Sequence, residues 1–454
     1  MSKSTKKTAT GVKKITQFEI IRPNVAGIDV SDNDSMMVAY PINEKEVQIE
    51  AFGCYTRDLR QISSTLKLHN IESVAMESTG VYWIPLFLLL QEDGFEVYLV
   101  NSKHVKNVTG RKDDEGDAEW IQKLHRCGLL SASFQPDNQT RALRSVIRHR
   151  SSLVKTRSTY LNRMQKALEQ MNLKIHTVIS DIDGKTGLDI INAILSGERN
   201  PEKLADLCNS RIKASRVEVI KSLEGFWLEV HLFELSQCYK LYKFHNEIIK
   251  ECDMKIKTLL QEIIKSKKNG VMPQLGKLKR KNNYKNSINV DVTNYLYEIN
   301  GVDIVSTKGI TGISEITALT IYSEIGDKWD CFKNEKHFAS WLGLAPNTKI
   351  SGGKTISSHI SKKKHHAGQV FRMAAMSLYN NKGPLGDYYR RIRSTAGHQK
   401  AIVALARKLA VIYYRMISTK KEYNPQCLID YQEKWRERKI RSLEIYLNKL
   451  KGVA

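Results

Sequence analysis

Four acidic side chains stand out because they come from separate stretches of the chain and could act together on a phosphodiester. Asp29 lies inside an apolar run, Glu77 ends a second one, and Asp114 and Asp117 follow three residues apart. Divalent cations such as Mg²⁺ prefer oxygen ligands, and two ions can activate an attacking oxygen and stabilise the leaving one. The set favours a two-ion Mg²⁺ site. An acidic helix start favoured by the helix dipole is the alternative, and Asp113 competes with Asp114 for the role.

A second group with chemical potential is Ser351-Gly352-Gly353-Lys354. A serine hydroxyl becomes a nucleophile when a metal or a neighbouring base activates it. Two glycines would let the backbone approach a phosphate closely, and Lys354 would offset the phosphate charge. Taken alone, these residues also fit an ordinary surface loop.

The elements that would position the acids alternate in a regular order. They are strands at Val25–Ser31, Met36–Tyr40 and Val47–Phe52, a helix at Arg57–Leu68, a strand at Ser73–Ser78, a helix at Val81–Gln91, a strand at Glu96–Val100 and a helix at Asp113–His125. Three strands followed by alternating helices and strands is the order of the α/β ribonuclease-H-like fold. In that order the first and fourth strands are neighbours, which would bring Asp29 and Glu77 to one end of the sheet.

Two long amphipathic stretches, 138–176 and 226–265, have apolar residues near heptad spacing and predict an α-helical coiled-coil middle. The first is very basic, and its arginines are candidates for nucleic-acid contact. A structural spacer or dimer arm with a solvated basic face is the alternative. The Lys- and Asn-rich segment 266–287 is expected to be a linker.

The region from 292 to 416 is expected to be mostly helical. Gly309-Ile310-Thr311-Gly312-Ile313 precedes an apolar helix at Ile316–Ile325 and resembles a helix-hairpin-helix element, whose backbone amides suit a DNA phosphate. Residues 182–187 look like a weaker copy. The residues expected to bind nucleic acid are Arg111, Lys112, Arg141, Arg144, Arg148, Arg157, Gly312, Gly352, Gly353, Lys354, Lys362 and Lys363.

Composition supports a polyanionic partner. The chain has 72 Lys and Arg against 48 Asp and Glu, a formal charge of +24, which is unusual for an enzyme acting on small molecules. Seven scattered cysteines show no metal-site or disulfide spacing, which favours a reducing cytoplasm. The longest apolar run, Val81–Leu90, is too short to span a bilayer, so no membrane partner is expected.

These patterns divide the 454 residues into five parts. They are a basic arm at 1–18, the ribonuclease-H-like domain at 19–137, the helical middle with its basic linker at 138–290, a domain with the candidate serine at 291–420, and a charged helical tail at 421–454.

Several motifs together resemble one family. In order they are Gly-Ile-Asp-Val-Ser at 27–31, Met-Glu-Ser-Thr-Gly-Val-Tyr-Trp at 76–83, Val-Asn-Ser-Lys-His-Val-Lys at 100–106, Gly-Arg-Lys-Asp-Asp-Glu-Gly-Asp-Ala at 110–118, Gly-Ile-Thr-Gly-Ile-Ser-Glu-Ile-Thr-Ala-Leu at 309–319, Leu-Gly-Leu-Ala-Pro at 342–346 and Ser-Gly-Gly-Lys at 351–354. The chain resembles a DEDD-type insertion-sequence transposase of family one-ten over residues 22–416. It departs from the usual motif by carrying Asp113 where Thr is more common.

The resemblance implies a RuvC-like N-terminal domain, a coiled-coil middle and a C-terminal domain with a catalytic serine. The four acids fall on Asp29, Glu77, Asp114 and Asp117, and the serine falls on Ser351. The implied reaction is strand cutting and rejoining through a phosphoserine link and a Holliday-junction-like intermediate, with Mg²⁺. The acids and the serine would come from different protomers.

The resemblance also implies partners. They are donor and target double-stranded DNA, a structured bridge RNA that pairs with both, and further copies of the chain in a dimer or tetramer. The expected location is the cytoplasm of a bacterial or archaeal cell, with the nucleoid.

Two other functions fit parts of the sequence. A metal-dependent junction nuclease would need the acids and water but not Ser351. A non-catalytic nucleic-acid-binding protein would tolerate loss of the acids, with an affinity that falls steeply with salt. Acids spread over separate elements do not help a basic binding surface, which favours the recombinase.

Overall fold

The computed structural model describes residues 19–31, 35–44, 46–78, 80–101, 114–267, 286–305, 309–360 and 365–450. The side chains of 114–115, 427–432, 434 and 450 are outside this description. The chain forms two compact units, residues 1–135 and 136–454. The boundary lies two residues before the one expected at 137, while the division of the second unit into further domains stays a prediction.

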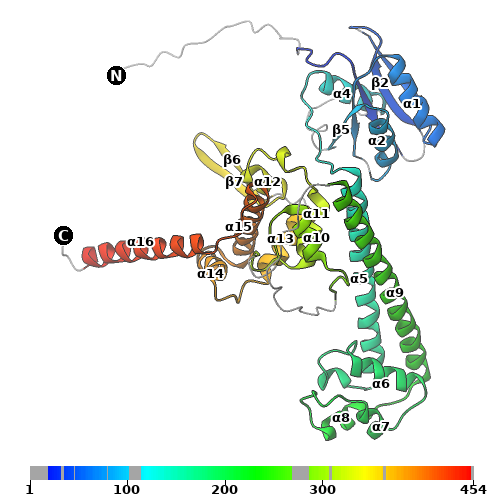
Figure 1. The fold of residues 1–454 in the computed structure, drawn as a ribbon, viewed down its shortest axis with the longest axis vertical. Coiled ribbons are helices and arrows are strands. Elements are labelled where there is room, and N and C mark those ends of the chain that lie inside the picture. The colour runs from blue at the N-terminus through cyan, green and yellow to red at the C-terminus, as the bar shows by residue number, and fades with distance from the viewer. Residues whose placement is uncertain are drawn as a thin grey trace, which may run out of the picture. The chain divides into compact units, whose positions relative to one another are not determined.

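The first unit is a mixed five-stranded sheet (Figure 1). Its elements are β1 (Val25–Asp29), β2 (Met36–Pro41), β3 (Val47–Phe52), α1 (Thr56–Leu68), β4 (Ser73–Glu77), α2 (Trp83–Glu92), β5 (Glu96–Val100) and α4 (Asp114–Arg126). The strand order is β3-β2-β1-β4-β5, with β1 antiparallel to β2 and parallel to β4. The element order and the adjacency of the first and fourth strands are confirmed.

Apolar side chains cover both faces of this sheet. Ile28, Val74 and Met76 face one core, which α1 and α2 complete with side chains such as Ile62 and Leu86. On the opposite face α4 packs against β1, β2 and β4. Strands that are buried on both sides read as continuous apolar runs, which is why β1 and β4 were visible in the sequence.

The second unit begins with two long helices that lie side by side, α5 (Asn138–Gln170) and α9 (Glu229–Ser266). The side chain of Asp137 accepts a hydrogen bond from the Thr140 amide and caps α5. Leu143, Ile147 and Met164 form part of the buried stripe of α5. The expected pair of amphipathic helices is confirmed, whereas supercoiled heptad packing stays a prediction.

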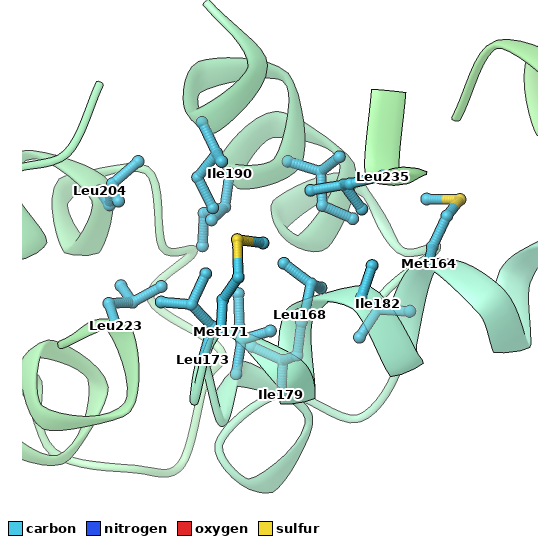
Figure 2. Packing of buried hydrophobic residues seen from close by; sticks show 14 of the residues in the cluster. Met164, Leu168, Met171, Leu173, Ile179, Ile182, Ile190, Leu204, Leu223 and Leu235 are labelled. Atoms are coloured by element: carbon cyan, nitrogen blue, oxygen red, sulfur yellow. The ribbon is translucent and has the colours of Figure 1, made fainter. Parts of the chain in front are cut away.

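A small helical lobe joins the far ends of α5 and α9, and the sequence reasoning did not foresee it. It contains the 3₁₀ turn η1 (Ile175–Thr177), α6 (Lys185–Leu195), α7 (Pro201–Asp206) and α8 (Arg216–Leu223). Figure 2 shows side chains from α5, the lobe and α9, including Met171, Ile190 and Leu235, converging on one core. Of residues 182–187, the first three form the turn that leads into α6 and the last three are its first helical turn, with Ile182 in this core.

The remaining elements of the second unit are mostly helical. They are α10 (Val292–Asn300), α11 (Glu315–Ile325), the 3₁₀ turn η2 (Trp329–Cys331), α12 (Glu335–Trp341), strands β6 (Pro346–Ser351) and β7 (Lys354–Ile360), α13 (His366–Met376), α14 (Pro384–Ala396), α15 (His398–Thr419) and α16 (Gln426–Leu450). Trp329, Phe338, Phe371 and Tyr413 build an aromatic core between them. The β6–β7 hairpin was not expected from the sequence.

Two absences hold for the described part of the chain. None of its helices is long and apolar enough to cross a membrane. The six cysteines whose side chains are described are all free thiols, which agrees with their scattered spacing.

Candidate functional site

Two of the four acids lie at matching positions on neighbouring strands. β1 and β4 run parallel with Ile28 opposite Met76, so the next residues of the register are Asp29 and Glu77. Side chains alternate between the two faces of a strand, and Ile28 and Met76 point into the α1–α2 core. Asp29 and Glu77 therefore point to the opposite face, which α4 covers. Glu77 is 7% exposed and Asp29 is half-buried.

Helix α4 brings the other two acids toward this end of the sheet. A Cβ on Gly27 would lie 2.3 Å from the Gln122 amide nitrogen and 2.4 Å from the Ala118 carbonyl oxygen, so only glycine permits this approach. Gln122 also donates a hydrogen bond to the Val25 carbonyl. The helix thus runs antiparallel to β1, and its first turn, with Asp117, lies toward the Asp29 end.

The donor set fits a hard divalent cation in chemistry. Carboxylate oxygens from two strands and one helix are ligands that Mg²⁺ accepts together with water and phosphate. The described side chains contain no group of three or more His, Cys, Asp or Glu arranged to hold a metal ion. The side chain of Asp114, the fourth expected ligand, lies outside the described set, as does Asp113. The register brings Asp29 and Glu77 together, and the metal site stays a prediction.

Ser351 stands at the tip of the β6–β7 hairpin. It pairs with Lys354 across a two-residue turn formed by Gly352 and Gly353, whose φ angles are +55° and +74°. Left-handed φ at both central positions is the requirement of a type I′ hairpin turn and explains the two glycines. The Ser-Gly-Gly-Lys motif is therefore a tight hairpin tip.

The hairpin is open to solvent around the serine. Every residue of β6 is exposed, and Ile350 next to Ser351 is 65% exposed. His359, a histidine of the same hairpin, pairs with Asn347, about 13 Å along the strand from the Ser351–Lys354 pair. That separation is too long for it to take the serine proton directly. A nucleophilic role for Ser351 would therefore need activation by a group other than His359.

All four arginines expected to bind nucleic acid along α5 have partners within the protein, and Arg157 bonds to Asn246 and Asn286. Arg148 donates two hydrogen bonds to the Glu324 carboxylate, at 2.8 and 2.7 Å. Arg144 lies 4.0 Å from the same carboxylate, and Arg141 donates to the Pro136 carbonyl. The contacts with Glu324 give Arg148 and Arg144 a structural role in joining α5 to α11, whether or not they also bind nucleic acid.

Glu324 is a buried acid in contact with basic side chains, and the sequence analysis did not single it out. Its side chain is 3% exposed, and His366 Nδ1 of α13 lies 3.2 Å from its Oε1. Burial raises the pKa of Glu324, but the contacts with His366, Arg148 and Arg144 outweigh burial and lower the pKa to about 2. The signal in the sequence was the one charged residue inside the otherwise uncharged run 316–325.

The other expected nucleic-acid residues divide into three groups. Gly312 has φ +92° and lies where a Cβ would come within 2.8 Å of Leu378, so packing in its turn already requires glycine. Gly352, Gly353 and Lys354 are exposed at the hairpin tip. Four of the expected residues lie outside the described residues: Arg111, Lys112, Lys362 and Lys363.

Comparison with known proteins matches both regions that carry the candidate chemistry. Residues 26–173 match a DEDD-type IS110 transposase family model, and residues 307–390 match the model of the transposase IS116/IS110/IS902 family. Together the matches cover about half of the chain. The chain belongs to the IS110 family of transposases. The first matched segment of this IS110-family chain contains all four acids, and the second contains Gly312 and Ser351.

One curated relative supports the same family. The transposase for insertion sequence element IS1111A of Coxiella burnetii (strain RSA 493 / Nine Mile phase I) is 25% identical over 126 residues. The aligned part is 27% of this IS110-family chain, which spans about a third of the length of that relative.

Proposed function

We propose that this chain is an insertion-sequence transposase that cuts and rejoins DNA with Ser351 as nucleophile and a Mg²⁺ site at Asp29, Glu77, Asp114 and Asp117. The observation that carries the proposal is the β1–β4 register, which sets Asp29 and Glu77 side by side on the α4 face. The strand order β3-β2-β1-β4-β5 with helices on both faces agrees with the ribonuclease-H-like, RuvC-like domain that we propose, and this agreement supports the acidic half of the site.

The protein's residues would divide the work as follows. The Ser351 oxygen attacks the phosphorus of a DNA strand and its hydroxyl proton passes to solvent. A serine–phosphate bond forms, the bond between phosphorus and the deoxyribose oxygen breaks, and that oxygen leaves and takes up a proton. A hydroxyl of the second strand then attacks that phosphoserine, which restores the serine and completes the exchange. Mg²⁺, when bound by the acids, would supply charge stabilisation at the phosphate oxygens. Lys354 beside the serine adds a positive charge for the same phosphate.

The guide in this proposal is a bridge RNA that pairs with donor and target DNA. The formal charge of +24 supports a large polyanionic partner. Such binding places the protein with the nucleoid in the cytoplasm of its cell.

A further part of the proposal is a homo-oligomer, a dimer or tetramer, formed through α9. Val230, Phe233, Leu241 and Phe244 lie at helical spacing on α9 and are 67%, 64%, 38% and 59% exposed. They leave an apolar stripe on the side of α9 that does not face α5. Light scattering of Phe233→Glu and Phe244→Glu variants should show smaller assemblies than the wild type.

The decisive experiment is covalent trapping. The protein is incubated with its element-flanking RNA, donor DNA, target DNA and Mg²⁺, and adducts are sought on a denaturing gel. An adduct that disappears in both Ser351→Ala and Asp29→Ala would establish the serine mechanism with its acidic site. Cleavage without an adduct, unchanged by Ser351→Ala, would replace it with a metal-dependent nuclease. The solvent exposure of Ser351 and its distance from His359 are what keep this second candidate open.

A further inference from the structure

The second unit contains a polar cavity of about 350 Å³ between α5, α9 and the segment before α10. We name it the α5–α9 cavity. The residues that line it are Arg150, Val154 and Arg157 of α5, Lys243, Asn246, Glu247, Ile249, Lys250 and Asp253 of α9, and Asn286, Ser287 and Asn289. Its size lies in the range of small-ligand pockets.

A buried ion pair is part of the cavity lining. Arg150 and Asp253 are buried, and Arg150 Nε donates to Asp253 Oδ1 at 2.5 Å. Arg150 also donates to the backbone carbonyls of Asn286 and Ser287. These bonds hold the segment before α10 against the two helices, so the cavity keeps its walls without a ligand.

Two cations of the lining are not matched by a carboxylate of the lining. Asp253 offsets Arg150, and Glu247 offsets Lys250 at 3.1 Å. Arg157 instead donates to the amide oxygens of Asn246 and Asn286, at 2.7 and 2.5 Å. Lys243 lies over the Tyr239 ring at 5.4 Å. The cavity therefore carries a net positive charge at Arg157 and Lys243.

The asparagines add neutral donors to this charge. Because Asn246 and Asn286 use their oxygens to accept from Arg157, their NH₂ groups remain oriented as donors. A cation pair with amide donors matches a group rich in acceptor oxygens, and an arginine with several donors suits phosphate best. The carboxylates are held in ion pairs, which limits their repulsion of an anion.

We propose that the α5–α9 cavity binds a phosphate group, with Arg157 and Lys243 supplying charge and Asn246 and Asn286 supplying hydrogen bonds. The favoured source is the backbone of a bound nucleic-acid strand, and this choice of source rests on the proposed function. A free phosphate would meet the same groups. Among the four arginines first singled out along α5, Arg157 is the one that lines this cavity.

The test uses variants of the full chain. Asn246→Asp keeps the side-chain size and the acceptor for Arg157 but places a negative charge in the cavity. Lys243→Ala removes a cation from an exposed side chain. The control Asn192→Asp makes the same charge change at an exposed position of α6 outside the cavity. Circular dichroism checks that each variant is folded.

Two probes separate the sources. The first is a single-stranded oligonucleotide, whose binding constant is measured against salt; the slope should fall by about one in Lys243→Ala and Asn246→Asp. Asn246→Asp should also weaken binding at least about tenfold. The second probe is inorganic phosphate, and its binding is measured as a rise in the unfolding temperature of the protein.

The outcomes are distinct. If both cavity variants lower the salt slope of oligonucleotide binding and Asn192→Asp does not, the result supports binding of a strand phosphate. If the cavity variants lose only the rise in unfolding temperature that inorganic phosphate gives the wild type, the result supports a free-phosphate site. Cavity variants that match Asn192→Asp with both probes overturn the proposal. A wild type that binds no nucleic acid would overturn the proposed function, while the inorganic-phosphate arm would still decide the cavity.

Discussion

The acidic end of the first unit and the serine hairpin of the second are built in opposite ways. Asp29 and Glu77 end paired strands of a five-stranded sheet whose α4 face is held at backbone contact through Gly27. Ser351 ends a strand of a two-stranded sheet whose residues are almost all exposed. Burial fixes the spacing of the acids before any substrate arrives, whereas the serine takes its geometry from a turn alone. Packing therefore positions Asp29 and Glu77, whereas no packing within the hairpin positions Ser351.

The largest expected effect is on the rate of DNA strand transfer. Ser351→Ala and Asp29→Asn should each reduce strand transfer by on the order of 10³-fold or more, since in the proposed mechanism each removes a group that acts on the reacting phosphate. Strand transfer on a gel with labelled donor DNA measures this. Ser358→Ala, on the same hairpin, is the matched control and should retain activity. Equal loss in the control would point to hairpin folding and not to a nucleophile.

The next effect compares two glycines. Gly27→Ala should destabilise the first unit by about 3 kcal/mol or more, because its Cβ would meet backbone atoms of α4 that cannot move aside. Gly352→Ala has open space around its Cβ and should cost only about 1 kcal/mol of left-handed strain. Hydrogen exchange of the β1 and β6 amides measures each change locally. Similar losses at both positions would remove the contrast between packed and unpacked sites.

A third effect tests the ion cluster that anchors α5 in the second unit. Glu324→Gln should destabilise this unit by about 3 kcal/mol, because it removes the buried negative charge that Arg144, Arg148 and His366 contact. The pKa of Glu324 is lowered to about 2, below its unfolded value. The stabilisation is therefore complete above about pH 4.5 and is lost as pH falls toward 2. Chemical denaturation at neutral pH and at pH 3 measures the free energy of unfolding of both proteins, and the difference between them should be smaller at pH 3. The same difference at both pH values would contradict the prediction.

The smallest effect concerns His125 in the first unit. Its ring nitrogen lies 2.8 Å from the Ser73 hydroxyl, and burial, followed by the charge of Arg22, lowers its pKa to about 4. The folded unit favours neutral histidine, so its stability is full above about pH 6.5 and falls by about 2 kcal/mol as pH drops toward 4. Melting curves between these pH values measure the fall. His125→Gln should remove this part of the pH dependence; a variant with the wild-type profile would refute the assignment.

The same contrast explains what could be predicted from the sequence. β1 and β4 were readable because two-sided burial demands unbroken apolar runs such as those before Asp29 and Glu77. β6 and β7 were missed because both their faces are exposed, so no alternation of apolar residues marks them. The Gly352-Gly353 pair was their one local signal.

Contacts between distant segments were beyond sequence reasoning. The partners of Arg148 and Arg157 lie on α11, on α9 and before α10, and no spacing rule connects residues so far apart in the chain. The basic stripe on α5 therefore looked uniform, although its members have different partners. The lobe of α6 to α8 was missed for a related reason, since its core forms only when α5 and α9 meet it.

The exposed tip of β6–β7 has a consequence for unwanted cutting of chromosomal DNA. His359 is too far along the hairpin to take the Ser351 proton, so the serine hydroxyl has a low intrinsic reactivity toward DNA unless another group activates it. If Ser351 cuts DNA, its effective concentration at a phosphate depends on whatever holds the hairpin and the acids to one substrate. In that case only an assembly that holds the hairpin and the acids to one substrate cuts DNA, and a single copy of the chain that collides with the chromosome does not cut it.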